Sequence, residues 1–337
     1  MSAQHNKLRA YLMVYGPILI QSGLLLILGN GTLDIAIIYT LVIFLLSESH
    51  FAATYLFFVS KANREWFFTL RTPVLQLASV CASGIVIGLF SVSALVFCAS
   101  IVSGFHVIRQ SIGIRKLVSS ESRDQKSDVL IYCLSFCCLG LAGFRFLVFP
   151  HMSQTLDLFR PFDGILNDDG FYIGLASILV CLCVIICVWL FRLRGLNLAI
   201  VVHGSLTYVP YLLFENQVLG HLASVSAHWV QYLVIQVFVF DTRFAQSSSR
   251  IVDRSPGHRR RSEVAYAIVC IVTYSAVMTI IWLRDFSVVG NATTSRLLII
   301  PVIFQLCHYL IDAHIWRFRD PFLAKSVGEK LKQLVAR

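Results

Sequence analysis

The sequence predicts an all-α fold, a polytopic transmembrane helical bundle of about ten spans with both termini in the cytoplasm. Of its 337 residues, 57% are hydrophobic and only 14% are charged, whereas a soluble domain carries about 25% charged residues. The mean hydropathy is +0.75. Apolar stretches of roughly 20 residues, the length that crosses the hydrocarbon core of a bilayer, recur along the chain. The third observation is the placement of the basic residues, which follows the spans.

The apolar stretches divide the chain into ten predicted spans. A tight turn at 29–31 separates the first two. The stretch 72–110 is too long for one helix and suits two, so we divide it near Ser91. The predicted spans are 10–28, 33–59, 72–91, 91–110, 129–149, 171–191, 196–214, 222–240, 264–283 and 297–318.

Lys and Arg indicate the orientation, because cytoplasmic loops collect basic residues. With ten spans and the N-terminus inside, all but four of the 28 Lys and Arg residues lie in cytoplasmic segments. Nine spans would place the basic residues between 109 and 126 on the opposite side. The chain then forms one integral membrane domain over 1–337, with a basic cytoplasmic loop at 241–263 and a basic cytoplasmic tail at 318–337. Of the four exceptions, we expect Arg145 to extend toward the outer surface of the bilayer.

The net charge of +10 does not indicate a nucleic-acid partner. Topology, together with attraction to anionic lipid headgroups at the cytoplasmic face, accounts for the basic segments. The expected location is therefore an integral, multi-pass position in a bacterial inner membrane or its equivalent. The ten cysteines show neither zinc-ribbon nor redox-motif spacing, so we interpret them as small packing residues.

Histidine recurs in five of the predicted spans. An ionisable group inside a bilayer costs about 3 kcal/mol on insertion scales, so such groups are usually paired or functional. The histidine heights are compatible with one shared site in the cytoplasmic half of the membrane. Hydrogen-bonding or proton-relay roles, and unconnected packing, remain as alternatives. The predicted metal ligands are His50, His106, His203, His228 and His308.

The last span, LLIIPVIFQLCHYLIDAHIWRF, adds a carboxylate to these histidines. His308 and Asp312 are four residues apart and share one helical face, one turn above the other. His314 points elsewhere and lies beside Trp316, where interfacial anchors belong. We therefore predict Asp312 as a ligand or as the orienter of a histidine. Glu48, two residues before His50, faces away from it and is a candidate buried acid. Asp312 and Glu48 are the predicted catalytic residues.

Each predicted ligand has polar neighbours at helical spacing. A metal-bound histidine normally has its second ring nitrogen held by such a partner. These neighbours would orient the imidazoles. The predicted outer-shell residues are Thr54, Gln110, Thr207, Gln231 and Tyr232.

Isolated histidines on separate spans resemble the pattern of the intramembrane carotenoid dioxygenases of the Brp/Blh type. That resemblance implies a multi-helix protein whose histidines hold a non-haem iron. Histidine-rich ligation independently suits a transition metal such as iron, with zinc and copper as alternatives. The predicted function is a membrane-embedded, histidine-ligated metalloenzyme, a non-haem iron oxygenase or related oxidoreductase acting on a lipid or isoprenoid. The alternatives are a transporter or channel with a His/Asp/Glu pathway, and a bis-histidine haem protein.

Overall fold

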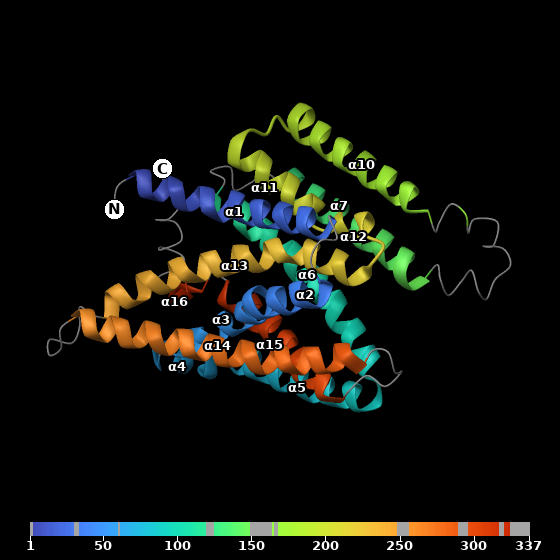
Figure 1. Ribbon diagram of the computed structural model, residues 1–337. Coiled ribbons are helices and arrows are strands. Elements are labelled where there is room, and N and C mark those ends of the chain that lie inside the picture. The colour runs from blue at the N-terminus through green and yellow to red at the C-terminus, as the bar shows by residue number, and fades with distance from the viewer. Residues whose placement is uncertain are drawn as a thin grey trace. The chain divides into compact units, whose positions relative to one another are not determined.

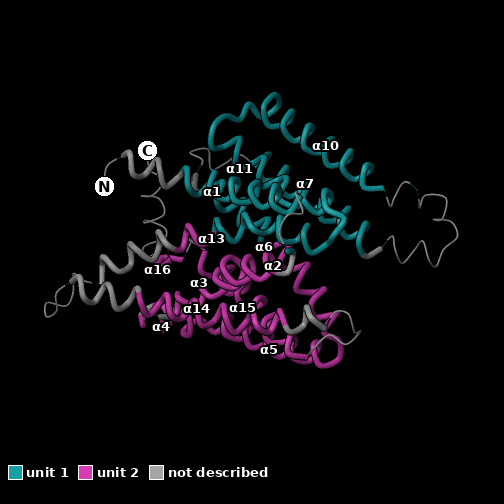
Figure 2. The backbone as a smooth tube through the Cα atoms, in the orientation of Figure 1, with its two compact units in different colours: residues 1–35, 107–231, 337 teal, residues 36–106, 232–336 magenta. Residues whose placement is uncertain are grey.

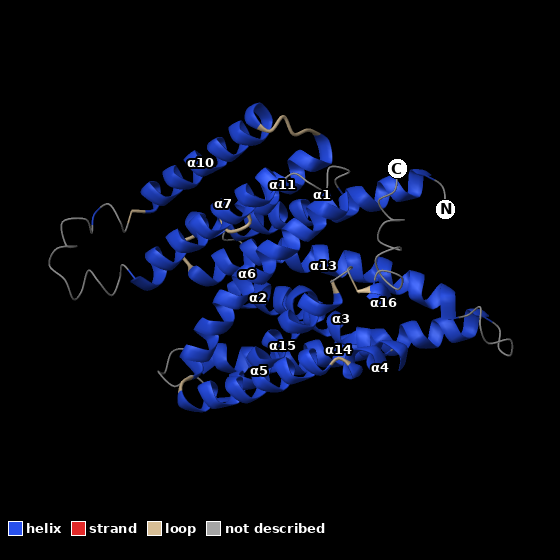
Figure 3. Cartoon of the chain, turned by 180° about the vertical axis from the view of Figure 1, so that it is seen from behind, coloured by secondary structure: helices blue, strands red, loops and turns tan. Residues whose placement is uncertain are grey.

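The structure is a computed structural model. Nearly every residue that it describes is helical, and none of them lies in a strand (Figure 1, Figure 3). This confirms the all-α class. The described residues are 3–29, 34–59, 61–118, 125–148, 164, 168–247, 256–288, 296–316 and 320–323.

Nine helical stretches in the described part of the chain are long and apolar enough to cross a membrane, so the protein is a multi-pass membrane protein. They match nine of the ten predicted spans. The nine stretches are Tyr11–Gly29, Ile37–Phe58, Arg71–Phe90, Val92–Lys116, Gln125–Phe146, Asp169–Leu190, Gln217–Gln236, Ala265–Leu283 and Arg296–Ile315.

The predicted span 196–214 is not one continuous helix, and its crossing of the membrane stays a prediction. α11 (Gly195–Leu206) has 12 residues, which corresponds to about 18 Å and is too short to cross a bilayer alone. A turn follows, and α12 (Pro210–Leu213) adds only four residues. Pro210 has no backbone N–H to bond to the carbonyl of Leu206, so the α-helical hydrogen-bond ladder is interrupted there, although Val209 before it keeps helical dihedral angles, φ −55° and ψ −36°.

The predicted division near Ser91 is confirmed. α5 (Arg71–Phe90) ends before Ser91, whose backbone is extended, with φ −156° and ψ 108°. α6 (Val92–Val118) begins directly after it. The Ser91 hydroxyl accepts a 3.2 Å hydrogen bond from the backbone N–H of Ala94, as a helix N-cap does.

The chain forms two compact units (Figure 2). Unit 1 comprises 1–35, 107–231 and 337, and unit 2 comprises 36–106 and 232–336. α6 and α13 (Gln217–Ser247) contribute residues to both. Within the predicted loop 241–263, residues 241–247 and 256–263 are helical ends of α13 and of α14 (Pro256–Val288), and 248–255 lie outside the described residues. The predicted tail 318–337 is described only at 320–323. The remaining elements of unit 1 are α1 (Ala3–Gly29), α7 (Gln125–Gly143), η3 (Phe144–Val148), α10 (Asp169–Ile185) and η5 (Ile186–Leu190), with α11 and α12.

Unit 2 begins at Ala36, within α2 (Ile35–Val42), which leads into a π-helical segment, η1 (Ile43–Glu48). Two helices of this unit, α3 and α15, carry residues of the candidate site described below. The other elements of unit 2 are α3 (Ser49–Tyr55), η2 (Leu56–Val59), α4 (Lys61–Thr69), α5, α14 (Pro256–Val288), η6 (Arg296–Leu298), α15 (Ile299–Ile315) and α16 (Pro321–Leu323).

In unit 1, Arg145 has partners within the protein, and its extension toward the outer surface of the bilayer stays a prediction. Its guanidinium pairs with Asp169 and lies 4.3 Å from the centre of the Tyr172 ring. It also donates a 3.0 Å hydrogen bond to the carbonyl of Leu212. The guanidinium thus interacts with a carboxylate, a carbonyl and an aromatic face inside the protein. Through these contacts Arg145 links η3 to α10 and α12.

In unit 2, α5 and α15 pack side by side along a seam with two glycines (Figure 1). A Cβ at Gly84 would lie 2.9 Å from Ile303 Cγ1, and one at Gly88 would lie 2.7 Å from Ile299 Cγ1. The contacts run in opposite chain directions, so the helices are antiparallel. Small residues four apart are the usual means of close helix approach in membranes. This seam fixes the position of α15.

Candidate metal centre

His308 and Asp312 lie one turn apart on α15 and are buried, with 0% and 2% exposure. Asp312 Oδ2 lies 3.7 Å from His308 Nε2 and 3.8 Å from His106 Nε2 of α6. The three side chains offer ligand atoms that all lie within 4.8 Å of one another, so they could hold a metal ion. Two histidines and one carboxylate form a ligand set typical of non-haem iron(II) sites.

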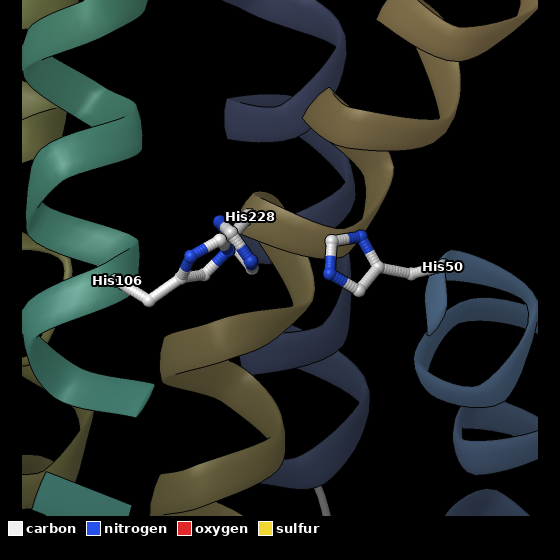
Figure 4. A group of neighbouring side chains, drawn as sticks. All are labelled: His50, His106 and His228. Atoms are coloured by element: carbon white, nitrogen blue, oxygen red, sulfur yellow. The ribbon is translucent and has the colours of Figure 1, made fainter. Parts of the chain in front are cut away.

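His50 of α3 extends this group within unit 2. Its Nε2 lies 2.9 Å from Nε2 of His308, and one of its ring nitrogens is within 4.8 Å of a ring nitrogen of His106. Figure 4 shows the imidazoles of His50 and His106 directed toward each other from α3 and α6. The His50 side chain is fully buried. Four predicted residues of unit 2 are therefore neighbours in the structure.

His50 follows η1 by two residues, and η1 is one of the π-helical segments in the described part of the chain. A π-helical turn inserts an extra residue and rotates the face presented by the helix that follows. Such segments occur frequently at functional sites. The turn therefore contributes to the direction in which His50 points.

The distances between these atoms suit a shared ion. Ligand atoms that each lie about 2.1 Å from one metal are about 3.0 Å apart at a right angle and about 3.4 Å apart at the tetrahedral angle. The 2.9 Å between the Nε2 atoms of His50 and His308 matches the first value. The 3.7 and 3.8 Å separations at Asp312 correspond to slightly wider angles.

Thr54 and Tyr232 contact the atoms of Asp312 and His308 that face away from the other candidate ligands. The Tyr232 hydroxyl donates a 2.7 Å hydrogen bond to Asp312 Oδ1. Thr54 donates to the same oxygen at 3.1 Å and makes a short contact with the Tyr232 hydroxyl. Thr54 Oγ1 is also 2.7 Å from His308 Nδ1. Both were predicted as outer-shell residues, but Thr54 contacts His308 on another helix rather than His50 on its own.

These contacts determine which atoms face the centre. Thr54 has one hydroxyl proton, and when it donates that proton to Asp312, His308 Nδ1 donates its own proton to Thr54. The lone pair of His308 then lies on Nε2, as metal binding requires. Asp312 Oδ1 accepts two hydrogen bonds, whereas Oδ2 is buried and has no hydrogen-bond partner among the described residues. A buried polar atom of this kind calls for an ion or a water.

Aromatic rings surround the imidazoles. The Phe51 ring centre lies 5.0 Å from that of His308, and the Tyr309 ring centre lies 4.7 Å from that of His106. The Tyr232 ring centre is 4.3 Å from that of His50. The walls around the ligand atoms are thus largely apolar. Sequence spacing did not identify Phe51 or Tyr309, because apolar residues in a span carry no functional signal.

Glu48 is fully buried in η1. Its Oε1 accepts a 3.0 Å hydrogen bond from the indole N–H of Trp282 on α14. Oε2 has no hydrogen-bond partner among the described residues. Glu48 is thus a buried acid, as predicted, while its catalytic role stays a prediction. The contact with Trp282 was not foreseen, because helix pairing cannot be read from one helix alone.

His314 lies on a different face of α15 from His308. Its Nε2 donates a 2.9 Å hydrogen bond to Gln76 of α5, and its ring packs near Phe67. The predicted separation of the two histidines therefore agrees with the structure. His314 is buried, with 7% exposure, and its predicted position at the membrane interface stays a prediction. It lies where α5 covers α15.

His203 belongs to unit 1, where it has a structural partner. Its Nε2 donates a 3.0 Å hydrogen bond to Gln21 of α1, and Gln21 donates in turn to the carbonyl of Ala223 at 2.8 Å. This chain links α11, α1 and α13. Thr207 bonds to the backbone carbonyl of His203 rather than to its ring. Metal ligation by His203 stays a prediction.

His228 is a buried residue of α13 and also belongs to unit 1. Its backbone carbonyl accepts a long, 3.5 Å hydrogen bond from Gln110. Gln231 bonds to the carbonyl of Met13 at 3.3 Å. The two glutamines thus contact backbone atoms and not imidazoles. A ligand role for His228 stays a prediction, supported by the four-residue spacing that separates it from Tyr232.

The comparisons with known proteins add no relative. No protein-family model, curated protein or solved structure matches the chain.

Proposed function

We propose that unit 2 binds a transition metal through His106, His308 and Asp312, with His50 as a fourth ligand. The observation that carries this proposal is the convergence of three ligand atoms, at His106, His308 and Asp312, together with the hydrogen bonds that hold the second polar atoms of His308 and Asp312. Asp312 directs Oδ2 toward the Nε2 atoms of two histidines, while Thr54 and Tyr232 occupy Oδ1. A packing role for these residues would not require Oδ2 to remain buried without a hydrogen bond.

Iron is the metal that the proposal favours. Two histidines and one carboxylate leave coordination positions open, and that arrangement suits non-haem iron(II). When bound, iron would supply redox chemistry with dioxygen. The protein's own residues would hold and shield it. Thr54 keeps His308 in the tautomer with Nδ1 protonated, Tyr232 orients the carboxylate, and the aromatic rings exclude water.

The proposed substrate is an apolar molecule such as a lipid or isoprenoid. All four ligands lie on stretches that are long and apolar enough to span the membrane. A buried site among such helices is reached most easily from the hydrocarbon phase. The rings of Phe51 and Tyr309 beside the imidazoles suit an unsaturated hydrocarbon chain. The proposal is therefore a membrane oxygenase or a related oxidoreductase.

For the topology, we propose both termini in the cytoplasm and the chain in a bacterial inner membrane or its equivalent. The basic residues support this orientation, since an even number of crossings keeps nearly all of them on one side. The even number requires α11 and α12 to act together as the tenth crossing, interrupted at Pro210. Anionic headgroups would then contact the cytoplasmic segments.

Transport is the second candidate, and Glu48 is the observation that favours it. A fully buried carboxyl in a span is often part of an ion or proton pathway. Haem binding has less support. Two histidines that sandwich a haem iron place their ligating nitrogens about 4 Å apart, at about 2 Å each. The Nε2 atoms of His50 and His308 are only 2.9 Å apart.

The test is the metal content of the purified protein. The full chain is produced in medium with ample iron, zinc and copper, extracted in detergent, and analysed for bound metals by mass spectrometry. We expect about one iron per chain, and loss of that iron from a His106→Ala, His308→Ala, Asp312→Ala triple variant. His221→Ala, in unit 1, is the matched control and should keep the metal.

Two outcomes would overturn the proposal. One is the absence of stoichiometric metal in the wild-type protein. The other is retention of the metal by the triple variant. Oxygen consumption by the iron-loaded protein, with membrane lipid extract as substrate, then separates an oxygenase from a transporter. Ion flux in proteoliposomes without oxygen consumption would favour transport.

A further inference from the structure

Two cysteines from distant parts of the sequence meet on the seam between α5 and α15. Cys81 Sγ and Cys307 Sγ are 3.5 Å apart, although 226 positions separate them in the chain. Both are free thiols. The distance corresponds to direct contact of the two sulfur atoms. Neither residue has a redox-motif spacing, so the sequence alone does not connect them.

The seam holds this pair in a regular series of contacts. His314 meets Gln76, Cys307 meets Cys81, and the two isoleucines of α15 meet the two glycines of α5. The residue numbers decrease along α15 as they increase along α5, so these pairs are successive contacts of one antiparallel interface. The glycines allow close approach of the backbones. The two thiols therefore face each other across a fixed interface, and their contact is not an isolated one.

We infer that Cys81 and Cys307 form a dithiol site that hydroperoxides oxidise to a disulfide joining α5 to α15. One thiol attacks the O–O bond of the hydroperoxide, becomes a sulfenic acid, and releases the alcohol, or water from hydrogen peroxide. The second thiol then attacks the sulfenic sulfur, the S–S bond forms, and water leaves. Two thiols lose two electrons and two protons, and the O–O bond is reduced.

Proximity favours this product over further oxidation. With the second thiol already in contact, its attack on the sulfenic acid is intramolecular, which gives a high effective concentration. A single exposed cysteine such as Cys98 has no such neighbour in the described contacts, so its oxidation would proceed from sulfenic to sulfinic acid. Cys81 is partly exposed on α5, whose other faces are exposed and apolar. Both dissolved peroxide and membrane-borne lipid hydroperoxide could reach it.

The disulfide would lock α15 next to a proposed ligand, because Cys307 directly precedes His308. It would fix the register of α15 against α5, the interface on which the position of His308 and Asp312 depends. The site does not require a metal, so it stands apart from the proposed function.

The experiment uses the full-length protein in liposomes, with hydrogen peroxide in one arm and cumene hydroperoxide in the other. Peptides are generated without reduction and analysed by mass spectrometry. We expect a Cys81–Cys307 cross-linked peptide in most chains, which dithiothreitol reverses, and a raised unfolding temperature for the oxidised protein. If just one of the two oxidants produces the cross-link, that result supports the dithiol site and also shows whether the hydroperoxide arrives from water or from the membrane.

The controls use single variants. Cys98→Ser should leave the cross-link unchanged. Cys81→Ser and Cys307→Ser should each lose the cross-link and accumulate sulfinic acid at the remaining thiol. The inference is overturned if wild-type protein shows oxidised Cys98 but no Cys81–Cys307 link in either arm. That result needs no variant to fold, and metal content does not affect it.

Discussion

The hydroxyl of Tyr232 donates a 2.7 Å hydrogen bond to Oδ1 of Asp312, while Oδ2 of the same carboxylate faces His308 and His106. One carboxylate thus has an oxygen held by hydrogen bonds and an oxygen that we propose as a metal ligand. The two roles depend on each other, because fixing Oδ1 determines where Oδ2 points. Loss of the tyrosine hydroxyl should therefore lower the affinity of the proposed site for metal.

Tyr232→Phe should weaken metal binding about 10- to 100-fold, the usual effect of losing an outer-shell partner. The ring stays in place against His50, so the fold should be preserved. The measurement is a metal titration of the apo protein in detergent. Tyr211→Phe is the matched control, since it removes a tyrosine hydroxyl bonded to His221 in unit 1. Equal affinity in Tyr232→Phe and wild type would show that Asp312 Oδ1 does not orient the ligand.

Two histidines of α15 should differ in what their loss affects. His308→Ala should abolish metal binding and activity, because it removes a ligand whose ring is fully buried among the others. His314→Ala should leave the metal bound. It should lower the free energy of unfolding by about 0.5–1.5 kcal/mol, because the hydrogen bond between His314 and Gln76 is lost. Metal content and urea unfolding measure the two effects separately.

The opposite pattern would require a different site. If His314→Ala released the metal while His308→Ala retained it, the face of α15 that looks toward α5 would be the binding face. The convergence of His106, His308 and Asp312 would then have no role in binding.

His50→Ala should reduce the affinity for metal without removing the site. His106, His308 and Asp312 remain as a complete two-histidine, one-carboxylate set. We expect one metal per chain at saturation, with a raised dissociation constant. A binding isotherm with increasing metal separates affinity from stoichiometry. Complete loss of binding at saturating metal would make His50 an essential ligand in place of an accessory one.

Sequence periodicity was informative about helix faces. The four-residue spacing of His308 and Asp312 placed both on one side of α15, and the six-residue spacing placed His314 on another. The long apolar run was divided correctly at Ser91, which caps α6. These are local properties that follow from 3.6 residues per turn and from capping.

Partners across helices could not be predicted in the same way. Thr54 was expected to serve His50, one turn away on its own helix, but it contacts His308 and Asp312 on α15. Cys81 and Cys307 were interpreted as separate packing residues. A face can be derived from spacing, whereas the identity of the opposing helix depends on tertiary packing. The break at Pro210 was not predicted, because the span was assigned from the hydropathy of the whole stretch and not from its one proline.

The last prediction concerns the glycines that allow α15 to approach α5. A Cβ at Gly88 would lie 2.7 Å from Ile299 Cγ1, and the nearby Leu95 leaves little room for the isoleucine to move. Gly88→Ala should therefore destabilise the protein by about 1–3 kcal/mol, as overpacking does, and displace α15 enough to weaken metal binding. Gly140→Ala is the matched control, since nothing lies within 4 Å of its added Cβ.

A second substitution tests whether the cause is steric. Ile299→Ala removes the side chain that the new Cβ would contact, so the double variant Gly88→Ala, Ile299→Ala should recover metal affinity relative to Gly88→Ala alone. The two positions touch, so their effects on stability should not be additive. Thermal unfolding and metal titration of the four proteins give this coupling. Additive effects, or a Gly88→Ala variant as stable as Gly140→Ala, would show that the seam between α5 and α15 is not what positions His308 and Asp312.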